Sequence, residues 1–164
     1  MHQILKIAGI AATGLAFVVG SPNFTQAQTT ANSNPRHASW KQNHRVVIQV
    51  TQNDPAVMNM ALNNAENLVK FYQDKGEQIQ IEFVAYGAGL HMFREDTSSV
   101  KERLAAMARG MKKNVTFSGC GNTLTNQSKQ ENKAISLVPE ARVVPAGIAR
   151  VVELEEQGWA YVRP

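Results

Sequence analysis

Hydrophobic and polar positions follow two different periods along residues 45–164 of this chain. Short runs of apolar and β-branched residues are typical of buried strands, whereas apolar residues at helical spacing are typical of packed helices. The patterns predict strands at 45–51, 78–86, 115–118, 142–144 and 159–162, and helices near 55–75, 98–111 and 146–157, with a polar helical segment after residue 120. Because strand and helix alternate, we predict an α/β sandwich in which helices cover both faces of a parallel sheet.

Three residues mark the ends of the first predicted helix. Asp54 is a favoured N-cap residue, and Pro55 fits the first helical position. Gly76 is of the type that commonly ends a helix. Helix capping therefore already accounts for Asp54, although Asn53 and Asp54 could also line a pocket.

Three loops, at 52–54, 87–91 and 119–122, follow the first three predicted strands. Sites in α/β proteins lie at the carboxyl ends of the strands, so these loops share one edge of the sheet if the strands are neighbours. The candidate site residues that they supply are Asn53, Asp54, Gly87, Gly89, His91, Gly119, Cys120, Gly121 and Asn122.

Cys120 is the only cysteine in the chain, and a glycine flanks it on each side. A single thiol cannot close an internal disulfide, so it is either a buried inert residue or a reactive group. If it lies just before a helix, the backbone N–H groups and the helix dipole there lower the pKa of the thiol. The residues by themselves leave both readings open.

The loop at Gly87-Ala88-Gly89 lacks the third glycine of a dinucleotide-binding fingerprint and follows the second strand, which favours a simple turn. His91 could act as an acid, a base or a partner of the Cys120 thiolate, but a single histidine beside a turn is more often a surface or packing residue. One cysteine and one histidine are too few ligands for a metal site. We therefore expect no metal and no cofactor.

Residues 1–27 have the composition of a secretory signal peptide. Lys6 precedes the apolar residues 7–20, which are too few for a comfortable membrane span, and Ala27 offers a small residue for cleavage. An uncleaved N-terminal anchor is the alternative. Residues 28–44 are polar and lack periodicity, which predicts a flexible leader before a single domain at 45–164.

The charge pattern argues against a nucleic-acid partner. The chain has 164 residues and a formal net charge of +4 at pH 7, and Lys112-Lys113 is its only adjacent basic pair. Dispersed charge without interleaved aromatic residues does not form a nucleic-acid footprint. We expect no contact with a membrane once the signal peptide is removed.

Six stretches, taken in order, resemble DsrE/DsrF-like proteins and in particular their small exported branch. They are 46–50 leading to 53–55, then 61–65, 84–90, 120–124, 143–147 and 158–164, and together they cover about residues 45–164. The resemblance implies a three-layer α/β/α fold with a mostly parallel sheet of about five strands. It also implies a homo-oligomer, commonly a trimer or a hexamer.

The resemblance further implies a function. The best-understood relatives are cytoplasmic proteins in which a cysteine near a strand end carries persulfide sulfur between partners. Carried over residue by residue, this role falls on Cys120 alone. We therefore predict a periplasmic protein that binds or relays sulfane sulfur, with a sulfur-donor or acceptor protein as partner. The alternative is a non-catalytic, oligomeric binding or assembly module in which Cys120 is structural, and the residues do not decide whether the protein is an enzyme.

Overall fold

The computed structural model of this protein describes residues 43–164. The expected signal peptide at 1–27 and most of the expected leader lie outside the described residues, so both stay predictions. The structure places Asn43 and His44, the last two residues of that leader, in the first strand. The ring of His44 stacks on Tyr72 of α1 with a centroid distance of 3.8 Å. The first strand therefore begins two residues before the predicted start of the domain at residue 45.

Strands and helices alternate along the described residues, as the hydrophobic periods predict. The strands are β1 (Asn43–Val50), β2 (Gln78–Ala85), β3 (Val115–Cys120), β4 (Ala141–Val144) and β5 (Ala160–Val162). The helices are α1 (Pro55–Asp74), α2 (Lys101–Gly110), α3 (Gly121–Gln130) and α4 (Gly147–Glu156), with a short 3₁₀ helix, η1 (Gly87–Met92). None of these helices is long and apolar enough to cross a membrane.

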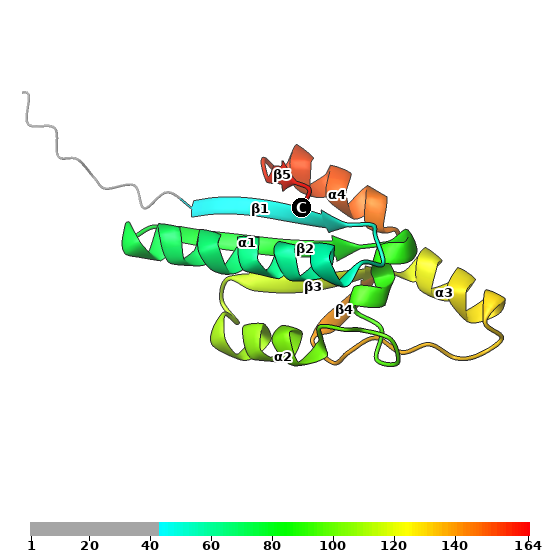
Figure 1. Ribbon diagram of the computed structural model, residues 1–164. Coiled ribbons are helices and arrows are strands. Elements are labelled where there is room, and N and C mark those ends of the chain that lie inside the picture. Colours follow the sequence, from blue (N-terminus) through cyan, green and yellow to red (C-terminus); the bar gives the residue numbers. More distant parts are fainter. Residues whose placement is uncertain (1–42) are drawn as a thin grey trace, which may run out of the picture. The chain divides into compact units, whose positions relative to one another are not determined.

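All five strands form one parallel sheet in the order β4-β3-β2-β1-β5. Helices α1 and α2 lie on one face of the sheet and α4 on the other (Figure 1). Because side chains alternate along a strand, Ile48 and Phe83 join the larger core with α1 and α2, whereas Val47 and Val84 pack beneath α4. The predicted fold class, a three-layer α/β/α sandwich, is confirmed.

Local sequence signals set the ends of α1. The carboxylate of Asp54 accepts a hydrogen bond from the backbone N–H of Ala56 at 2.7 Å, and Pro55 is the first residue of the helix. Beyond the helix, Gly76 has a φ of 71°, a left-handed conformation that glycine adopts without steric cost. The predicted cap and stop of this helix are therefore both confirmed.

The glycine turn that the sequence predicts at 87–89 is the first turn of η1. Gly87 has a φ of 56°, and a Cβ added to Gly89 would lie 2.1 Å from the carbonyl oxygen of Val50. Gly87 is therefore required by its left-handed backbone conformation, whereas Gly89 is required because it packs closely against the end of β1. Turn geometry accounts for this loop, and no phosphate need be invoked to explain it.

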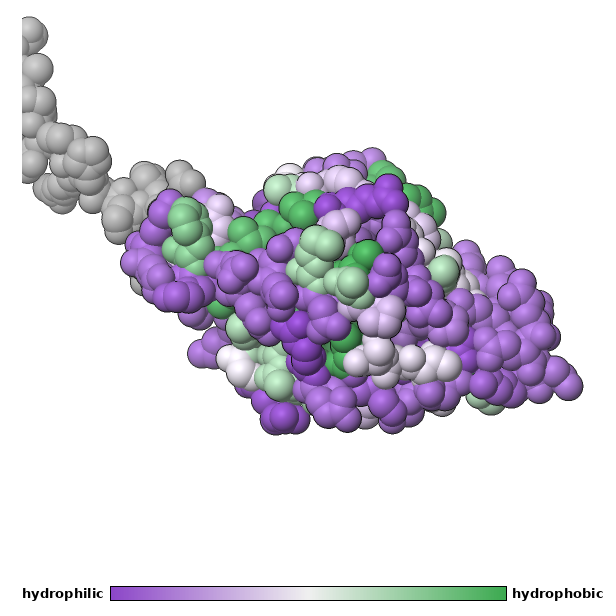
Figure 2. All heavy atoms as spheres, viewed as in Figure 1, coloured by the Kyte–Doolittle hydropathy of each residue, from purple (hydrophilic) through white to green (hydrophobic). Residues whose placement is uncertain are grey.

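The third helix differs from the others in how it meets the body of the domain. Helices α1, α2 and α4 each bury side chains in the core, whereas α3 contributes no buried residue. Figure 2 shows hydrophilic residues over the part of the molecule that α3 forms. The position of α3 must therefore depend mainly on polar contacts, because little apolar surface is buried beneath it.

A buried carboxylate joins four elements on the α4 face of the sheet. Glu82 of β2 is 2% exposed and accepts a hydrogen bond from the hydroxyl of Ser118 in β3 at 2.7 Å. Arg142 of β4 donates to it at 3.0 Å, and Arg150 of α4 donates through Nε and Nη2 at 2.8 Å each. Burial raises the pKa of the Glu82 carboxyl group, but the hydrogen bonds from Arg150, Ser118 and Arg142 outweigh burial and hold the pKa below its usual value.

Replacing Glu82 with Gln should lower the free energy of unfolding by about 3 kcal/mol, because the largely buried Arg150 would lose its buried counter-charge and keep only the exposed Glu153. Urea unfolding followed by circular dichroism measures this change. Glu153→Gln is the matched control, since its 3.4 Å contact with Arg150 is an exposed ion pair whose loss should cost under about 0.5 kcal/mol. Equal losses in the two variants would contradict a special role for Glu82.

The same carboxylate predicts how stability depends on pH. Since the folded-state pKa of Glu82 lies below the usual 4.5, its contribution should be complete above about pH 4.5 and should fall as the pH drops through the folded-state value. The Glu82→Gln variant lacks this group. Its stability should therefore change less than that of the wild type between pH 5 and pH 3, as urea midpoints measured at both pH values would reveal.

Candidate functional site

The carboxyl ends of β1, β2 and β3 lie side by side, because these strands are parallel neighbours. The three candidate loops, at 52–54, 87–91 and 119–122, follow these strands and therefore meet at one edge of the sheet. The connection from β4 to α4 ends at the same edge, since β4 pairs with β3. We call this the carboxyl edge, the place where α/β proteins commonly hold a site.

Cys120 lies on the carboxyl edge, at the end of the strand between β2 and β4. It is the last residue of β3 and the N-cap of α3, and the backbone N–H of Thr123 donates to its Sγ at 3.5 Å. The residue is 5% exposed. The predicted position of the thiol, just before a helix, is confirmed, and the thiol is also nearly covered.

Opposing effects act on the pKa of the Cys120 thiol. Burial is the largest single effect and raises the pKa. The Thr123 hydroxyl and the backbone N–H groups of Gly147, Thr123 and Asn122 favour the thiolate and together leave the pKa below its usual value, and the Thr123 N–H donates a hydrogen bond to Sγ at 3.5 Å. The site therefore stabilises a buried thiolate through several neutral donors, without a positively charged side chain among them.

Three of these four groups belong to two residues, Thr123 and Gly147, that sequence reasoning missed. Thr123 lies three positions after the N-cap, where a side chain can reach back to the cap. Its hydroxyl accepts a hydrogen bond from the backbone N–H of Gly87 at 3.0 Å, which leaves the hydroxyl hydrogen free to point at Cys120. The spacing Cys-x-x-Thr at a predicted helix start was the available signal for Thr123.

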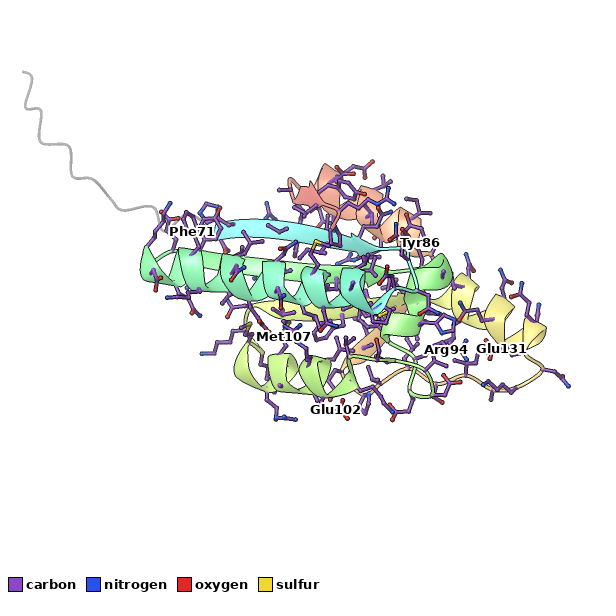
Figure 3. All side chains as sticks on the ribbon, viewed as in Figure 1. Phe71, Tyr86, Arg94, Glu102, Met107 and Glu131 are labelled. Atoms are coloured by element: carbon purple, nitrogen blue, oxygen red, sulfur yellow. The ribbon has the colours of Figure 1, made fainter. Side chains whose placement is uncertain are left out.

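Gly147, the first residue of α4, was also missed. A Cβ added to it would lie 2.9 Å from the Tyr86 side chain and 3.1 Å from Cβ of Cys120. Only glycine lets the N-terminus of α4 approach the thiol this closely. Figure 3 shows Tyr86 at this edge of the sheet. The available signal for Gly147 was that it follows the fourth strand, as Gly121 follows the third.

The glycines on either side of Cys120 serve close packing. A Cβ on Gly119 would lie 2.6 Å from the Leu137 side chain, and one on Gly121 would lie 3.1 Å from the Val143 side chain. Asn122 contributes through its backbone, whose N–H also lies 3.2 Å from the carbonyl oxygen of Pro145. These predicted residues therefore shape the surroundings of the thiol through the backbone rather than through side-chain chemistry.

The other predicted residues are less closely tied to the thiol. Asp54 caps α1, and Asn53 is exposed. The ring Nδ1 of His91 hydrogen-bonds with the hydroxyl of Thr97 at 2.8 Å, so its recorded partner is Thr97 rather than Cys120. Among the described residues, no group of three or more His, Cys, Asp or Glu side chains could hold a metal ion.

Comparison with known proteins bears on the fold. The chain matches no protein-family model and no curated protein. It is similar to the solved structure of a protein of unknown function, MTH1491, from Methanobacterium thermoautotrophicum. The two sequences are 28% identical, the match covers 74% of this chain and 99% of that one, and the TM-score is 0.61. The shared region is thus a complete α/β sandwich of the same class.

Replacing Thr123 with Val should raise the pKa of the Cys120 thiol, because valine keeps the side-chain shape and the backbone N–H but lacks the hydroxyl donor. Thr123→Ser retains the hydroxyl and should stay close to the wild type. The rate of alkylation by iodoacetamide, measured against pH, gives the pKa of all three proteins. A pKa that is the same in all three would rule out the hydroxyl as a stabiliser of the thiolate.

Proposed function

We propose that this chain is an exported, periplasmic DsrE/DsrF-like protein that binds or relays sulfane sulfur through Cys120. The observation that carries the proposal is the position of the thiol between the N-termini of α3 and α4: the Thr123 N–H of α3 donates to Sγ at 3.5 Å, and Gly147, the first residue of α4, packs against Cys120. Such a setting lowers the pKa of a thiol and raises the population of the nucleophilic thiolate. The order of the six DsrE/DsrF-like stretches supports the family assignment.

The proposed reaction is thiol–persulfide exchange at Cys120. The thiolate Sγ attacks the outer sulfur of a persulfide donor, so that a new S–S bond forms and the donor's own S–S bond breaks. The donor leaves as a thiolate, and the transferred sulfur stays on Cys120 as a persulfide. No external oxidant or reductant is needed, because one S–S bond replaces another. Repeating the exchange with an acceptor thiol completes the relay.

The proposal includes an assembly and partners. By family resemblance we expect a homo-oligomer, either a trimer or a hexamer, and a separate protein that donates or accepts the sulfur. The apolar side chains that the described residues leave most exposed, Val143 and Ile148, flank the β4–α4 connection next to Cys120. A contact between subunits there would lie close to the thiol.

The second candidate function is a non-catalytic binding or assembly module. The observation that favours it is the low exposure of Cys120, which is 5%. A small buried residue between a strand and a helix can serve packing alone. In that case the hydrogen bonds to Sγ would stabilise the turn from β3 into α3 rather than a nucleophile.

Incubating the purified protein with polysulfide and weighing it intact tests the proposal. The wild type should gain the mass of one sulfur atom per chain, and the adduct should disappear on treatment with a thiol reductant. Cys120→Ser should gain nothing while keeping the circular dichroism spectrum of the wild type. A wild-type protein that takes up no sulfur when folded, yet is modified after unfolding, would make Cys120 structural and favour the binding module.

A further inference from the structure

Residues 121–134, which we call the arm, leave the body of the domain after Cys120 and rejoin it at Ile135. The arm comprises α3 and the turn that follows, and none of its residues is buried, whereas Cys120 and Ile135 on either side are. Within this turn, Asn132 has a φ of 48°, a left-handed conformation that helps to reverse the chain. The arm therefore gains little stability from hydrophobic burial.

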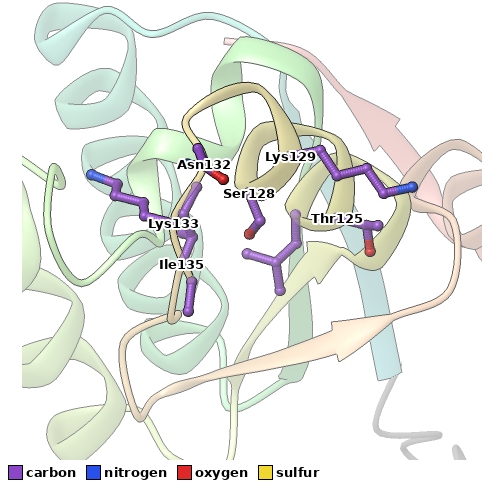
Figure 4. A pocket seen from close by; sticks show the side chains of 8 residues that line it. Thr125, Ser128, Lys129, Asn132, Lys133 and Ile135 are labelled. Carbon is purple, nitrogen blue, oxygen red and sulfur yellow. The ribbon is translucent and has the colours of Figure 1, made fainter.

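A hollow of about 690 Å³ lies between α3 and the returning chain. Figure 4 shows side chains from both segments lining it, among them Thr125 and Ser128 from α3 and Lys133 from the return. The hollow is open and has hydroxyl and ammonium groups in its wall. The side of α3 that faces the returning chain therefore borders an open space that water can enter, and not a hydrophobic core.

Polar contacts hold the far end of the arm. Arg94, whose side chain is fully buried, donates to Asp96 at 2.7 Å, to Gln127 at 3.2 Å and to Glu131 at 2.8 Å. Lys133 bridges Asp96 at 2.8 Å and Glu131 at 3.2 Å. We call these five residues the Arg94 cluster, and Figure 3 shows Arg94 and Glu131 next to each other. Hydrogen bonds from Arg94 hold the pKa of the Glu131 carboxyl at about 2, so this carboxylate is charged at neutral pH.

The near end of the arm covers the thiol. The side-chain amide of Gln127 donates to the carbonyl of Gly87 at 3.1 Å, and the backbone N–H of Gly87 donates to the Thr123 hydroxyl at 3.0 Å. The first turn of α3 begins at Cys120, which is its N-cap, and places the Thr123 N–H 3.5 Å from Sγ. Displacing the arm would uncover the sulfur and would also remove the donors that α3 supplies.

We propose that the arm opens and closes over Cys120, and that the contacts between the Arg94 cluster and α3 set the fraction of molecules in which it is open. A segment with few buried apolar contacts opens at a lower free-energy cost than the whole domain, because its opening leaves the core intact. Cys120 then meets reagents mainly in the open form. The opening of the arm does not depend on any sulfur chemistry. Its role, which is to control the access of a sulfur donor to the thiol, rests on the proposed function.

Weakening the Arg94 cluster on the arm side tests the proposal. Glu131→Ala removes one ionic partner of Arg94 and leaves Asp96 in place, so Arg94 keeps a counter-charge. The rate at which iodoacetamide alkylates Cys120 in the folded protein should rise about tenfold, because losing a charged hydrogen-bond partner shifts the opening equilibrium by about that factor. Gln127→Ala should raise the rate less, because it removes neutral partners.

Asp74→Asn is the matched control. It breaks the exposed ion pair between Lys70 and Asp74 on α1 and removes the same charge without touching the arm, so its alkylation rate should equal that of the wild type. Urea unfolding of each variant shows whether the effect is local. An unchanged rate in Glu131→Ala would overturn the proposal, and so would a rise no larger than the accompanying increase in global unfolding.

Hydrogen exchange gives a second, independent readout. Amides of α3 should exchange faster than those of β2 and β3, and in Glu131→Ala they should exchange faster by the same factor as the alkylation rate. Sulfur uptake separates the two proposals. If Glu131→Ala speeds alkylation but the protein never takes up sulfur, the opening of the arm is supported and the proposed function is refuted. If the protein takes up sulfur but Glu131→Ala changes no rate, the proposed function is supported and the opening of the arm is refuted.

Discussion

The arrangement of the carboxyl edge depends on one buried carboxylate. Glu82 sits in the middle of β2, and a carboxylate without water there must be compensated by charged or hydroxyl donors. Arg142 of β4 and Arg150 of α4 supply that compensation, so the edge strand and the helix after it are held to the centre of the sheet. Gly147 begins the same helix less than one turn before Arg150. The backbone amide of Gly147, which lowers the pKa of the Cys120 thiol, is therefore positioned by the ion pair between Glu82 and Arg150.

A second buried charge, the guanidinium of Arg94, holds α3 in position, as Glu82 holds α4. The guanidinium of Arg94 binds Glu131 near the end of α3, while Arg150 of α4 binds Glu82. Cys120 lies between the N-termini of these two helices. The two ion pairs thus help to keep the first turns of both helices next to Cys120, above all that of α3, which buries no residue of its own.

Much of this architecture could be predicted from the sequence, and the remainder could not for a physical reason. Hydrophobic periods located the strands and helices, and the flanking glycines placed Cys120 at a strand end before a helix. Glu82 escaped notice because it interrupts an apolar strand and its partners are distant in sequence. Gly147 was missed for the same reason, since its contact with Cys120 exists only because β4 pairs with β3. His91 was a reasonable candidate whose partner, Thr97, depends on the course of a loop.

The first turn of α3 both stabilises the thiolate and lies against the buried sulfur. The Thr123 N–H donates to Sγ at 3.5 Å, and Cys120 is only 5% exposed. Deprotonation and closure therefore favour each other, because a donor that binds the thiolate better than the thiol holds the closed form more strongly once the proton has left. An open arm exposes a thiol that has lost those donors and kept only the amide of Gly147. A partner that binds the open form would have to replace the missing donors to keep the sulfur nucleophilic, which would restrict transfer to partners that supply them.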